Sequence, residues 1–556
     1  MRGTRLFLLA LSSSLLFALG LPNEQYLMGF PPLGYLALIP LYLALLELRT
    51  WKGAALALGL YGALHHAASS YWLWYFQDFA LWTLGFTTLA YFVVYASSGL
   101  VVIHLLRRAG QFRPLAFALL WTGFEYLKST GFLAYPWGLL PYTQSSFLPL
   151  LQIADTTGVY GLSFVLAFAN AALGELFFTP AGPASGFPSS PLSSREREAG
   201  PPQPRPGDFP SQPIARRLEP SPLLGQAGFA LLLVAICLAY GLGRLASPPA
   251  LRGEVAILLV QQNLNPWSEG GEAALEANTQ LLKEALAGPG PRPDLVLFSE
   301  SSLGYPFVDG QAWYEKNPRT EPFLPFLRRQ GLWLLTGSPV VLDWKQFTAT
   351  NSVILIDPQG RVAGDYAKIH PVPFAEAIPF FEFSWFRAFL KKAVGLDAGW
   401  TMGTKYTVFS LPSPSGRVRF GAPICFEDAF APLCATLVRE GADLLVNLTD
   451  DSWSRTKSAE YQHLAAARFR SIETRRSLVR STNSGVSCLV TPTGEIREEL
   501  PAFTASQKLV RVPLVEPLGT PYLRLGDWFA TLCLLAVALW TFILGVRAIP
   551  KGRRAA

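Results

Sequence analysis

Three polar side chains in the second half of the chain follow apolar, strand-like runs, and their types suit covalent catalysis. Glu300 ends the run 296–300, Lys368 lies in the segment 366–376, and Cys425 lies in the segment 421–428. Ligands of open α/β sheets bind at strand ends, and a cysteine becomes a nucleophile where a base or a cation favours its thiolate. We therefore hypothesise that Glu300 takes the thiol proton of Cys425. Lys368, helped by the backbone N–H of Phe426, would stabilise the thiolate and then the oxyanion.

Each of these residues also has an ordinary structural interpretation. A cysteine after an apolar strand is usually a small core residue, and a glutamate or lysine in a loop is usually solvated. Spacing along the chain does not by itself join three separate segments into one site. The elements around the candidate triad must therefore show whether it can form.

The region that carries the triad, residues 247–525, alternates between strand-like and helix-like segments. Short apolar runs typical of buried strands occur at 255–260, 295–298, 332–335, 351–356, 444–447 and 487–490. Helix-like stretches lie at 272–287, 321–330, 429–440 and 459–474. This alternation predicts an α/β domain.

The rest of the chain is unusually apolar. Of the 556 residues, 50% are hydrophobic, 13% are aromatic and only 15% are charged, whereas a soluble protein has about 25% charged residues. A helix needs about 20 apolar residues to cross the hydrocarbon core of a membrane. Runs of spanning length occur at 5–21, 32–48, 53–75, 79–105, 114–134, 158–178, 223–246 and 526–547. We interpret the first as a retained span, because Gly20-Leu21-Pro22 offers no clear signal-peptide cleavage site.

These runs divide the chain into a membrane part and one large inserted domain. Six spans fall in residues 1–178, a seventh at 223–246, the α/β domain at 247–525 and an eighth span at 526–547, before a basic tail at 548–556. Residues 179–222 contain 12 prolines and too few apolar groups to form a core, so we expect a disordered linker.

The basic residues predict the orientation. With eight spans, every basic loop, the linker and the tail fall on one side, and the loops 22–31 and 76–78 on the other side contain no lysine or arginine. By the positive-inside rule the basic side is cytoplasmic. The α/β domain is therefore expected outside the cytoplasm.

Composition also argues against several partners. The net charge of +7 is explained by these cytoplasmic segments, so we expect no nucleic acid partner. The five cysteines are scattered and form no CxxC pair, which argues against a disulfide framework and a zinc site. We also find no GxxxxGK or HExxH motif, and we expect no metal and no cofactor.

Further short motifs surround the triad, and others lie in the apolar first part of the chain. They are Ser299–Ser302, Lys368–Glu376, Ile424–Glu427, Asn447–Trp453, Gln462-His463, Ala467-Arg468, Arg480–Gly485, Pro492–Ile496, Phe124–Leu127, Tyr135–Gly138 and Gly158–Phe164. Together with the order Glu300, Lys368, Cys425, they resemble the apolipoprotein N-acyltransferase branch of the carbon–nitrogen hydrolase (nitrilase) superfamily. The resemblance covers nearly the whole chain except the proline-rich linker.

The resemblance implies a four-layer αββα sandwich on an eight-helix membrane base. It implies an enzyme that moves an acyl chain from a phospholipid to the α-amine of the diacylglyceryl-cysteine at the N-terminus of a maturing bacterial lipoprotein. The resemblance implies that Cys425 is the acylated nucleophile, Glu300 the general base and Lys368 the oxyanion-stabilising cation. Glu376 and Glu427 match two further acidic positions, of a kind that can hold a lysine charged and in place.

The partners implied are a phospholipid donor, a diacylglyceryl-lipoprotein acceptor and the membrane. The implied location is the bacterial inner membrane, crossed several times, with the catalytic domain on the extracytoplasmic side. We expect a monomer, and ping-pong kinetics through a thioester.

One segment after Lys368, residues 378–396, is too aromatic for a solvated loop. Its candidate lipid contacts are Phe380, Phe381, Phe383, Trp385, Phe386 and Phe389. Mixed aromatic and basic stretches lie in the bilayer interface, so we predict an arm or lid that dips into the outer leaflet; packing against the sandwich is the alternative. Trp267 resembles a family aromatic near the acyl site and is a further candidate contact.

Two other functions fit parts of the sequence. A membrane-tethered amidase or nitrilase that hydrolyses a small C–N bond would use the same triad, but it would need only one anchoring span. A transporter or binding protein with an inactive domain would not need the triad, and transporters carry paired, broken spans that are not evident here. The acyltransferase hypothesis accounts for both halves of the chain.

Overall fold

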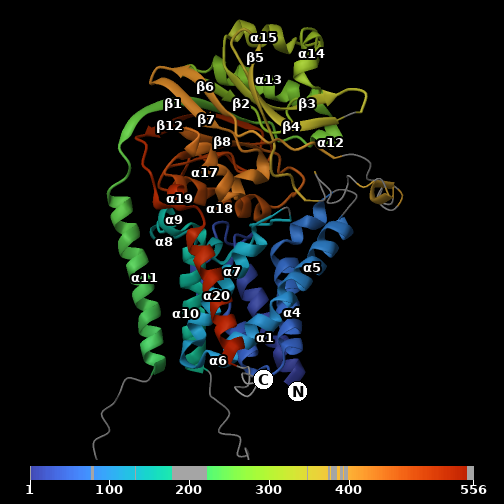
Figure 1. Cartoon of the computed structure of the whole chain (residues 1–556). Coiled ribbons are helices and arrows are strands. Elements are labelled where there is room, and N and C mark those ends of the chain that lie inside the picture. Colours follow the sequence, from blue (N-terminus) through green and yellow to red (C-terminus); the bar gives the residue numbers. More distant parts are fainter. Residues whose placement is uncertain are drawn as a thin grey trace, which may run out of the picture.

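The computed structural model describes residues 2–76, 80–131, 133–177, 222–346, 348–373 and 399–547, together with 376, 383, 385–388 and 392. Long helices form a base, and a domain built on two sheets lies on one end of that base (Figure 1). The predicted linker, apart from Pro222, and the predicted tail at 548–556 lie outside the described residues.

The base is formed mainly by the first part of the chain. Its helices are α1 (Arg2–Gly20), α2 (Pro31–Gly34), α3 (Ile39–Glu47), α4 (Trp51–Ser69), α5 (Ala80–Ser97), α6 (Gly99–Arg108), α7 (Arg113–Lys128), α8 (Leu148–Leu151), α9 (Ala154–Thr157) and α10 (Val159–Phe177). Three short 3₁₀ helices join them: η1 (Tyr71–Tyr75), η2 (Gly110–Phe112) and η3 (Leu140–Gln144). Two later helices, α11 (Pro222–Ala246) and α20 (Trp528–Arg547), connect the base to the two ends of the inserted domain.

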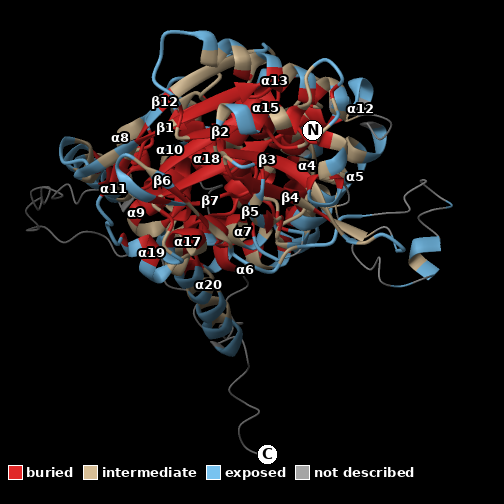
Figure 2. Cartoon of the chain, turned by 90° about the horizontal axis from the view of Figure 1, so that it is seen from above, coloured by how far each residue is buried: buried red, intermediate tan, exposed pale blue. Residues whose placement is uncertain are grey.

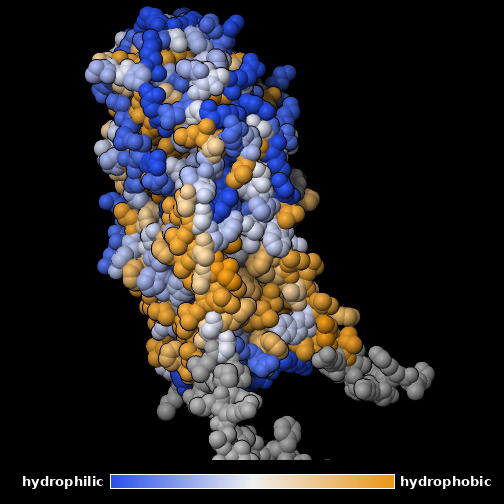
Figure 3. All heavy atoms as spheres, turned by 90° about the vertical axis from the view of Figure 1, so that its left-hand side faces the viewer, coloured by the Kyte–Doolittle hydropathy of each residue, from blue (hydrophilic) through white to orange (hydrophobic). Residues whose placement is uncertain are grey.

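The surface of the base is apolar enough for a membrane. Within the described residues, five helical segments are long and apolar enough to cross one: Gly3–Gly20, Leu81–Arg108, Val159–Phe177, Gly225–Ala246 and Trp528–Val546. Large apolar side chains on them face outward, such as Leu231 and Phe542, and Figure 3 shows the resulting apolar surface below a hydrophilic domain. A soluble monomer does not expose apolar surface on this scale. The chain is a membrane protein.

The other three predicted spans differ in detail from the continuous helices expected. The run 32–48 is interrupted between α2 and α3, where Pro40 in the first turn of α3 has no N–H to continue the helical ladder. The run 53–75 ends as a helix at Ser69, and the run 114–134 ends at Lys128. The count of eight spans stays a prediction.

The inserted domain contains two six-stranded sheets in the described part of the chain. The first has the order β12-β1-β2-β3-β4-β5, and the second has the order β11-β10-β9-β8-β7-β6. The strands of the first sheet are β1 (Leu251–Gln261), β2 (Leu295–Leu297), β3 (Leu334–Asp343), β4 (Thr348–Ile356), β5 (Val362–Ala367) and β12 (Ser506–Val515). Those of the second are β6 (Val408–Ser413), β7 (Gly416–Gly421), β8 (Leu444–Thr449), β9 (Ser477–Thr482), β10 (Cys488–Val490) and β11 (Ile496–Arg497).

The pairing pattern explains where polar residues collect. Strands β1, β2 and β3 are parallel neighbours, and so are β7, β8 and β9, while the outer strands pair antiparallel. The carboxyl ends of parallel strands lie at one edge of each sheet. The loops after β2, β7 and β8 therefore emerge close together.

Helices cover the outer face of each sheet, which completes the four-layer αββα sandwich that the resemblance implies. Apolar side chains of both sheets, such as Leu297, Leu355 and Val446, form the core between the sheets. The helices α12 (Pro266–Glu269), α13 (Gly271–Ala287), α14 (Phe307–Tyr314) and α15 (Phe323–Gln330) belong to the first half of the domain, and side chains of α13, α14 and α15 pack on the outer face of the first sheet. The second half contributes η4 (Cys425–Ala429), α17 (Ala431–Arg439), α18 (Lys457–Thr474) and α19 (Pro521–Leu525). Seen from above, the buried residues lie along the strands and the helices beneath them (Figure 2).

The domain and the base share one apolar core. A single cluster of buried side chains runs from base helices, for example Phe117 and Leu166, to Leu437 of α17 and Leu464 of α18. Gln462 of α18 also joins several base segments, because its amide oxygen accepts from the indoles of Trp72 and Trp137 at 3.2 and 2.8 Å. Its amide nitrogen donates to the carbonyl of Ser69 at 2.9 Å. The domain is therefore fixed on the base and not merely tethered to it.

A buried ion pair strengthens this junction. The guanidinium of Arg475 lies 2.6 Å from a carboxylate oxygen of Asp155, on α9, and both side chains are buried. The hydroxyl of Tyr240, on α11, donates to the same carboxylate at 2.6 Å. Asp155 thus connects the domain, the base and the helix that leads into the domain.

We predict that Asp155→Ala destabilises the full chain by about 3–5 kcal/mol, because it leaves a buried arginine without its counter-ion. Thermal unfolding of the detergent-solubilised protein measures the change. Arg497→Ala, which breaks an exposed pair with Glu495, is the control and should change stability by less than about 1 kcal/mol. Equal effects of the two substitutions would contradict the role of this ion pair.

Candidate active site

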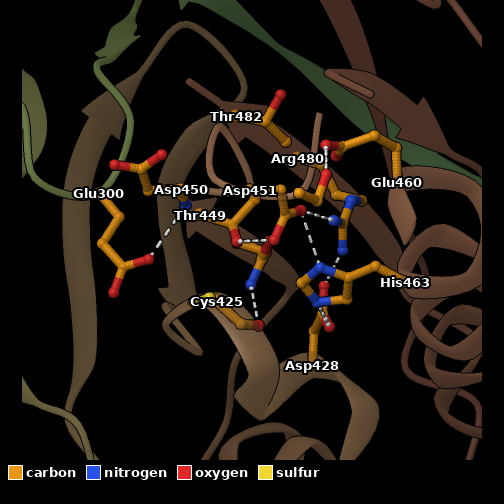
Figure 4. Close-up of polar contacts among 12 residues, drawn as sticks. Glu300, Cys425, Asp428, Thr449, Asp450, Asp451, Glu460, His463, Arg480 and Thr482 are labelled. Atoms are coloured by element: carbon orange, nitrogen blue, oxygen red, sulfur yellow. Dashed lines mark hydrogen bonds and ion pairs between the residues drawn. The ribbon is translucent and has the colours of Figure 1, made fainter. Parts of the chain in front are cut away.

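The fold brings the three residues of the candidate triad together. Glu300 follows β2 of the first sheet, Lys368 follows β5 of the same sheet, and Cys425 begins η4 just after β7 of the second sheet. Figure 4 shows Glu300 and Cys425 in neighbouring loops at the strand ends. The site lies where the edges of the two sheets meet.

Lys368 is buried between two carboxylates. Its Nζ lies 2.8 Å from Oε1 of Glu376 and 3.6 Å from Oε1 of Glu300. Burial alone would lower the pKa of Lys368, but Glu376 and Glu300 raise the pKa well above the usual value for lysine. Lys368 is therefore a fixed positive charge, and the carboxylate of Glu376 pairs with it directly.

Glu300 is oriented by two further donors. The side-chain amide of Asn351, on β4, donates to Oε1 at 2.8 Å, and the backbone N–H of Asp450 donates to Oε2 at 3.0 Å. The same amide of Asn351 donates to Glu376 at 3.0 Å. Burial raises the pKa of Glu300, while Lys368 acts in the opposite direction. A carboxylate with a raised pKa that is held in place is suited to accept and return a proton.

Cys425 has an uncommon backbone conformation and a thiol whose pKa is raised. Its φ is +51°, a left-handed value that residues other than glycine rarely adopt and that is held by surrounding structure. The amide of Asn447, on β8, donates to the carbonyls of Pro423 and Cys425, each at 3.0 Å. Burial and the nearby Glu300 raise the pKa of the Cys425 thiol well above its usual value. A base must therefore remove the proton before or during nucleophilic attack.

Glu427 has a different role from Glu376. Its carboxylate accepts from the backbone N–H groups of Ile369, His370 and Ile424 at 2.6, 2.9 and 2.8 Å. The hydroxyl of Tyr366 donates to it at 3.0 Å. Glu427 thus ties the backbone after Lys368 to the backbone before Cys425, and it positions these segments instead of binding the lysine.

The other predicted residues fall partly inside the described structure. Phe426 is buried, and its ring lies 6.0 Å from each of the rings of Tyr135 and Trp137 in the base. In the aromatic segment, Phe383 and Trp385 are 48% and 69% exposed, and Phe386 is half-buried against Trp385 at 5.5 Å. Phe380, Phe381, Phe389 and the side chain of Trp267 lie outside the described residues.

Several residues support the site whose role was not predicted from the sequence, although Asn447 and Asp450 lie in the motif Asn447–Trp453. Asn351, Asn447 and Asp450 each contact Glu300 or the Cys425 turn. A signal was available for two of them, because Asn447 ends an apolar run and Asp450 follows it closely, which is the position where α/β sites collect. Asn351 gave no such signal, since it lies within β4 and reaches the site only because β4 pairs with β3 and β5.

The two stacked sheets, with Glu300, Lys368 and Cys425 at their meeting edges, form a domain with the fold of the carbon–nitrogen hydrolases. Residues 256–515 match the family model described as Carbon-nitrogen hydrolase. Residues 13–172 match the model described as Apolipoprotein N-acyltransferase N-terminal domain. The carbon–nitrogen hydrolase match therefore covers the inserted domain, and the base matches a separate family model.

Full-length relatives identify the family. The chain is 38% identical over 546 residues to apolipoprotein N-acyltransferase 2 of Treponema denticola, covering 98% of both chains. It is also 38% identical to apolipoprotein N-acyltransferase 2 of Treponema pallidum, covering 98% of this chain and 95% of the relative. Apolipoprotein N-acyltransferase of Borreliella burgdorferi is 29% identical over 97% of this chain and 95% of its own length. The chain belongs to the apolipoprotein N-acyltransferase family.

We predict that Glu427→Gln destabilises the protein by about 2–3 kcal/mol, because an amide N–H₂ would face several donors that now share a carboxylate. It should also slow reaction of Cys425, although Glu427 does not bind Lys368. Tyr366→Phe removes only one donor and should cost about 1 kcal/mol. Thermal unfolding of both variants measures the two losses of stability. Equal losses would contradict the role of Glu427 in tying the backbone after Lys368 to the backbone before Cys425.

Proposed function

We propose that the chain transfers a fatty acyl group from a phospholipid to the α-amine of the diacylglyceryl-cysteine at the N-terminus of a lipoprotein. The observation that carries the proposal is the arrangement of Glu300, Lys368 and Cys425 on a domain fixed to a membrane base. Membership of the family supports both the transfer reaction and the lipid and lipoprotein substrates.

In the first half-reaction Cys425 attacks the ester carbonyl of the phospholipid. Glu300 takes the thiol proton as the C–S bond forms, which removes the need for a preformed thiolate. The tetrahedral intermediate collapses by breaking the C–O bond. Glu300 returns the proton to the leaving oxygen, so that a lysophospholipid leaves and an acyl thioester remains on Cys425.

The charge that develops on the carbonyl oxygen needs donors that are already in place. Lys368 supplies a fixed ammonium, and the backbone N–H of Phe426 follows the nucleophile directly. Donors fixed in a buried site stabilise an oxyanion without reorganising. Glu376 contributes indirectly, because it keeps Lys368 charged and in place.

In the second half-reaction the lipoprotein amine attacks the thioester. Glu300 takes a proton from the amine, the C–N bond forms, and the C–S bond breaks. The proton returns to sulfur, which restores the Cys425 thiol. Division into two steps at one site gives ping-pong kinetics.

We also propose an orientation in the membrane, which the basic residues of the base support. The base end opposite the catalytic domain carries the start of α1 and the end of α6, with Arg107 and Arg108 (Figure 1). Basic residues on one side support a cytoplasmic location for that side. We therefore assign the catalytic domain to the extracytoplasmic face of the inner membrane, and we expect the protein to act as a monomer.

We predict that Cys425→Ala abolishes formation of an acyl-enzyme from labelled phospholipid, because it removes the thiol that attacks the ester in the proposed reaction. Mass spectrometry of the intact chain, with and without a diacylglyceryl peptide, measures the thioester and its loss to the peptide amine. Cys434→Ala, which removes a buried thiol of the domain core, is the matched control and should still be acylated. Acylation of the Cys425→Ala chain, or ammonia release from small amides with no acyl transfer, would overturn the proposal.

We further propose that the aromatic segment 378–396 contacts the lipid surface, in line with the exposure of Phe383 and Trp385. Trp385→Ser should reduce transfer from bilayer phospholipid about tenfold while leaving turnover of a short soluble ester within about twofold, since burial of one tryptophan contributes on the order of 1.5–3 kcal/mol. Steady-state rates on both donors check this. Equal loss on both donors would contradict a lipid contact.

A further inference from the structure

A group of buried charged residues lies directly behind the turn that carries Cys425. It consists of Asp428, Asp451, Glu460, His463 and Arg480 (Figure 4). These residues come from η4, the loop after β8, helix α18 and strand β9. No step of the proposed reaction uses them, yet burying several charges is costly unless each is compensated.

His463 is the centre of this group. Its Nε2 lies 2.8 Å from Oδ1 of Asp428, and its Nδ1 lies 2.9 Å from Oδ2 of Asp451, with only 3% of the side chain exposed. Burial alone would lower the pKa of His463, but Asp451 and Asp428 raise the pKa to about 9. The ring is therefore an imidazolium that donates from both nitrogens, which fixes its orientation.

The two carboxylates belong to opposite parts of the candidate site. Asp428 lies in η4, three residues after Cys425, so its position is tied to that of the nucleophile. Asp451 follows Asp450, whose backbone N–H donates to Glu300. His463 thus bridges the turn that carries the nucleophile and the loop that orients the base.

The neighbouring residues hold this bridge in one arrangement. Arg480 forms a second ion pair with Asp428, so two cations balance two carboxylates. Burial and the nearby Asp451 raise the pKa of Glu460 well above its usual value, and the hydroxyl of Ser454 donates to Oε1 of Glu460 at 2.8 Å. On the other side, the ring of Trp137 from the base lies 5.3 Å from the imidazole. A bridge with these contacts has little freedom to shift.

We propose that His463 is a positioning residue for acyl transfer, which fixes the distance between the Cys425 turn and the backbone amide that orients Glu300. This inference rests on the proposed function, because it concerns the geometry of the same thiol and base. A displacement of about 1 Å between reacting groups can cost about 100-fold in rate. Loss of the bridge should therefore slow the chemistry without removing any group that touches the substrate.

The test is a pre-steady-state measurement of thioester formation on Cys425 in the full chain, with labelled phospholipid in detergent micelles. The burst amplitude reports the fraction of correctly folded sites, and the rate constant reports the chemistry at those sites. His463→Gln should lower the rate constant about 100-fold while the amplitude stays within about twofold of that of the unsubstituted chain. A purely structural role would instead lower the amplitude and leave the rate constant unchanged.

Tyr461→Phe is the matched control on α18, because it removes a hydrogen bond to Glu499 that lies away from the Cys425 turn, and it should leave both quantities unchanged. If His463→Gln yields no folded protein, Asp428→Asn tests the bridge from the other side and should lower the rate constant at least tenfold. An unchanged rate constant in the folded variant would overturn the inference. Absence of the thioester from the unsubstituted chain would overturn the proposed function, and this inference with it.

Discussion

The burial of the Lys368 ammonium between Glu376 and Glu300 is the constraint on which the rest of the site depends. An ammonium taken out of water costs several kcal/mol unless carboxylates and hydrogen bonds compensate for it. The two carboxylates come from separate segments, so their strands and loops must end at fixed places. Asn351 donates to both carboxylates, and Glu427 ties the lysine loop to the cysteine turn. The sandwich therefore holds the carboxylates rigidly beside the ammonium, because burial of an uncompensated charge would destabilise the fold.

The same rigidity extends into the membrane base. Phe426, which follows the nucleophile, packs beside Trp137, and Trp137 lies 5.7 Å from Trp72 at the upper end of the base. Gln462 accepts from both indoles, and one apolar core continues through the junction. An enzyme that takes its acyl donor from a membrane gains from this arrangement, since the nucleophile keeps a constant position relative to the apolar surface of the base.

Periodicity and turn signals predicted many elements but not their partners. The apolar runs at 255–260, 295–298 and 444–447 are strands, and the stretches 272–287 and 459–474 are helices, as expected. Strand β9 was missed, because its sequence contains Arg480 and reads as polar; the charge is buried only because Asp428 lies opposite. The run 32–48 was predicted as one continuous helix but forms two, α2 and α3. Hydropathy alone does not account for the missing N–H of Pro40. Glu427 was predicted as a supporting acidic residue of the site, and only the structure shows that it binds backbone amides.

The sequence by itself determined the apolar base and the α/β alternation of the inserted domain, and through family motifs it predicted Glu300, Lys368 and Cys425 as the candidate triad. These properties are local, because they depend on residue type and on spacing along one segment. Only the tertiary structure decided which residues orient the triad, such as Asn351, and that His463 bridges two loops. Such contacts join residues that are distant in the chain, and the direction of a hydrogen bond depends on how strands pair and sheets stack, which no single segment encodes.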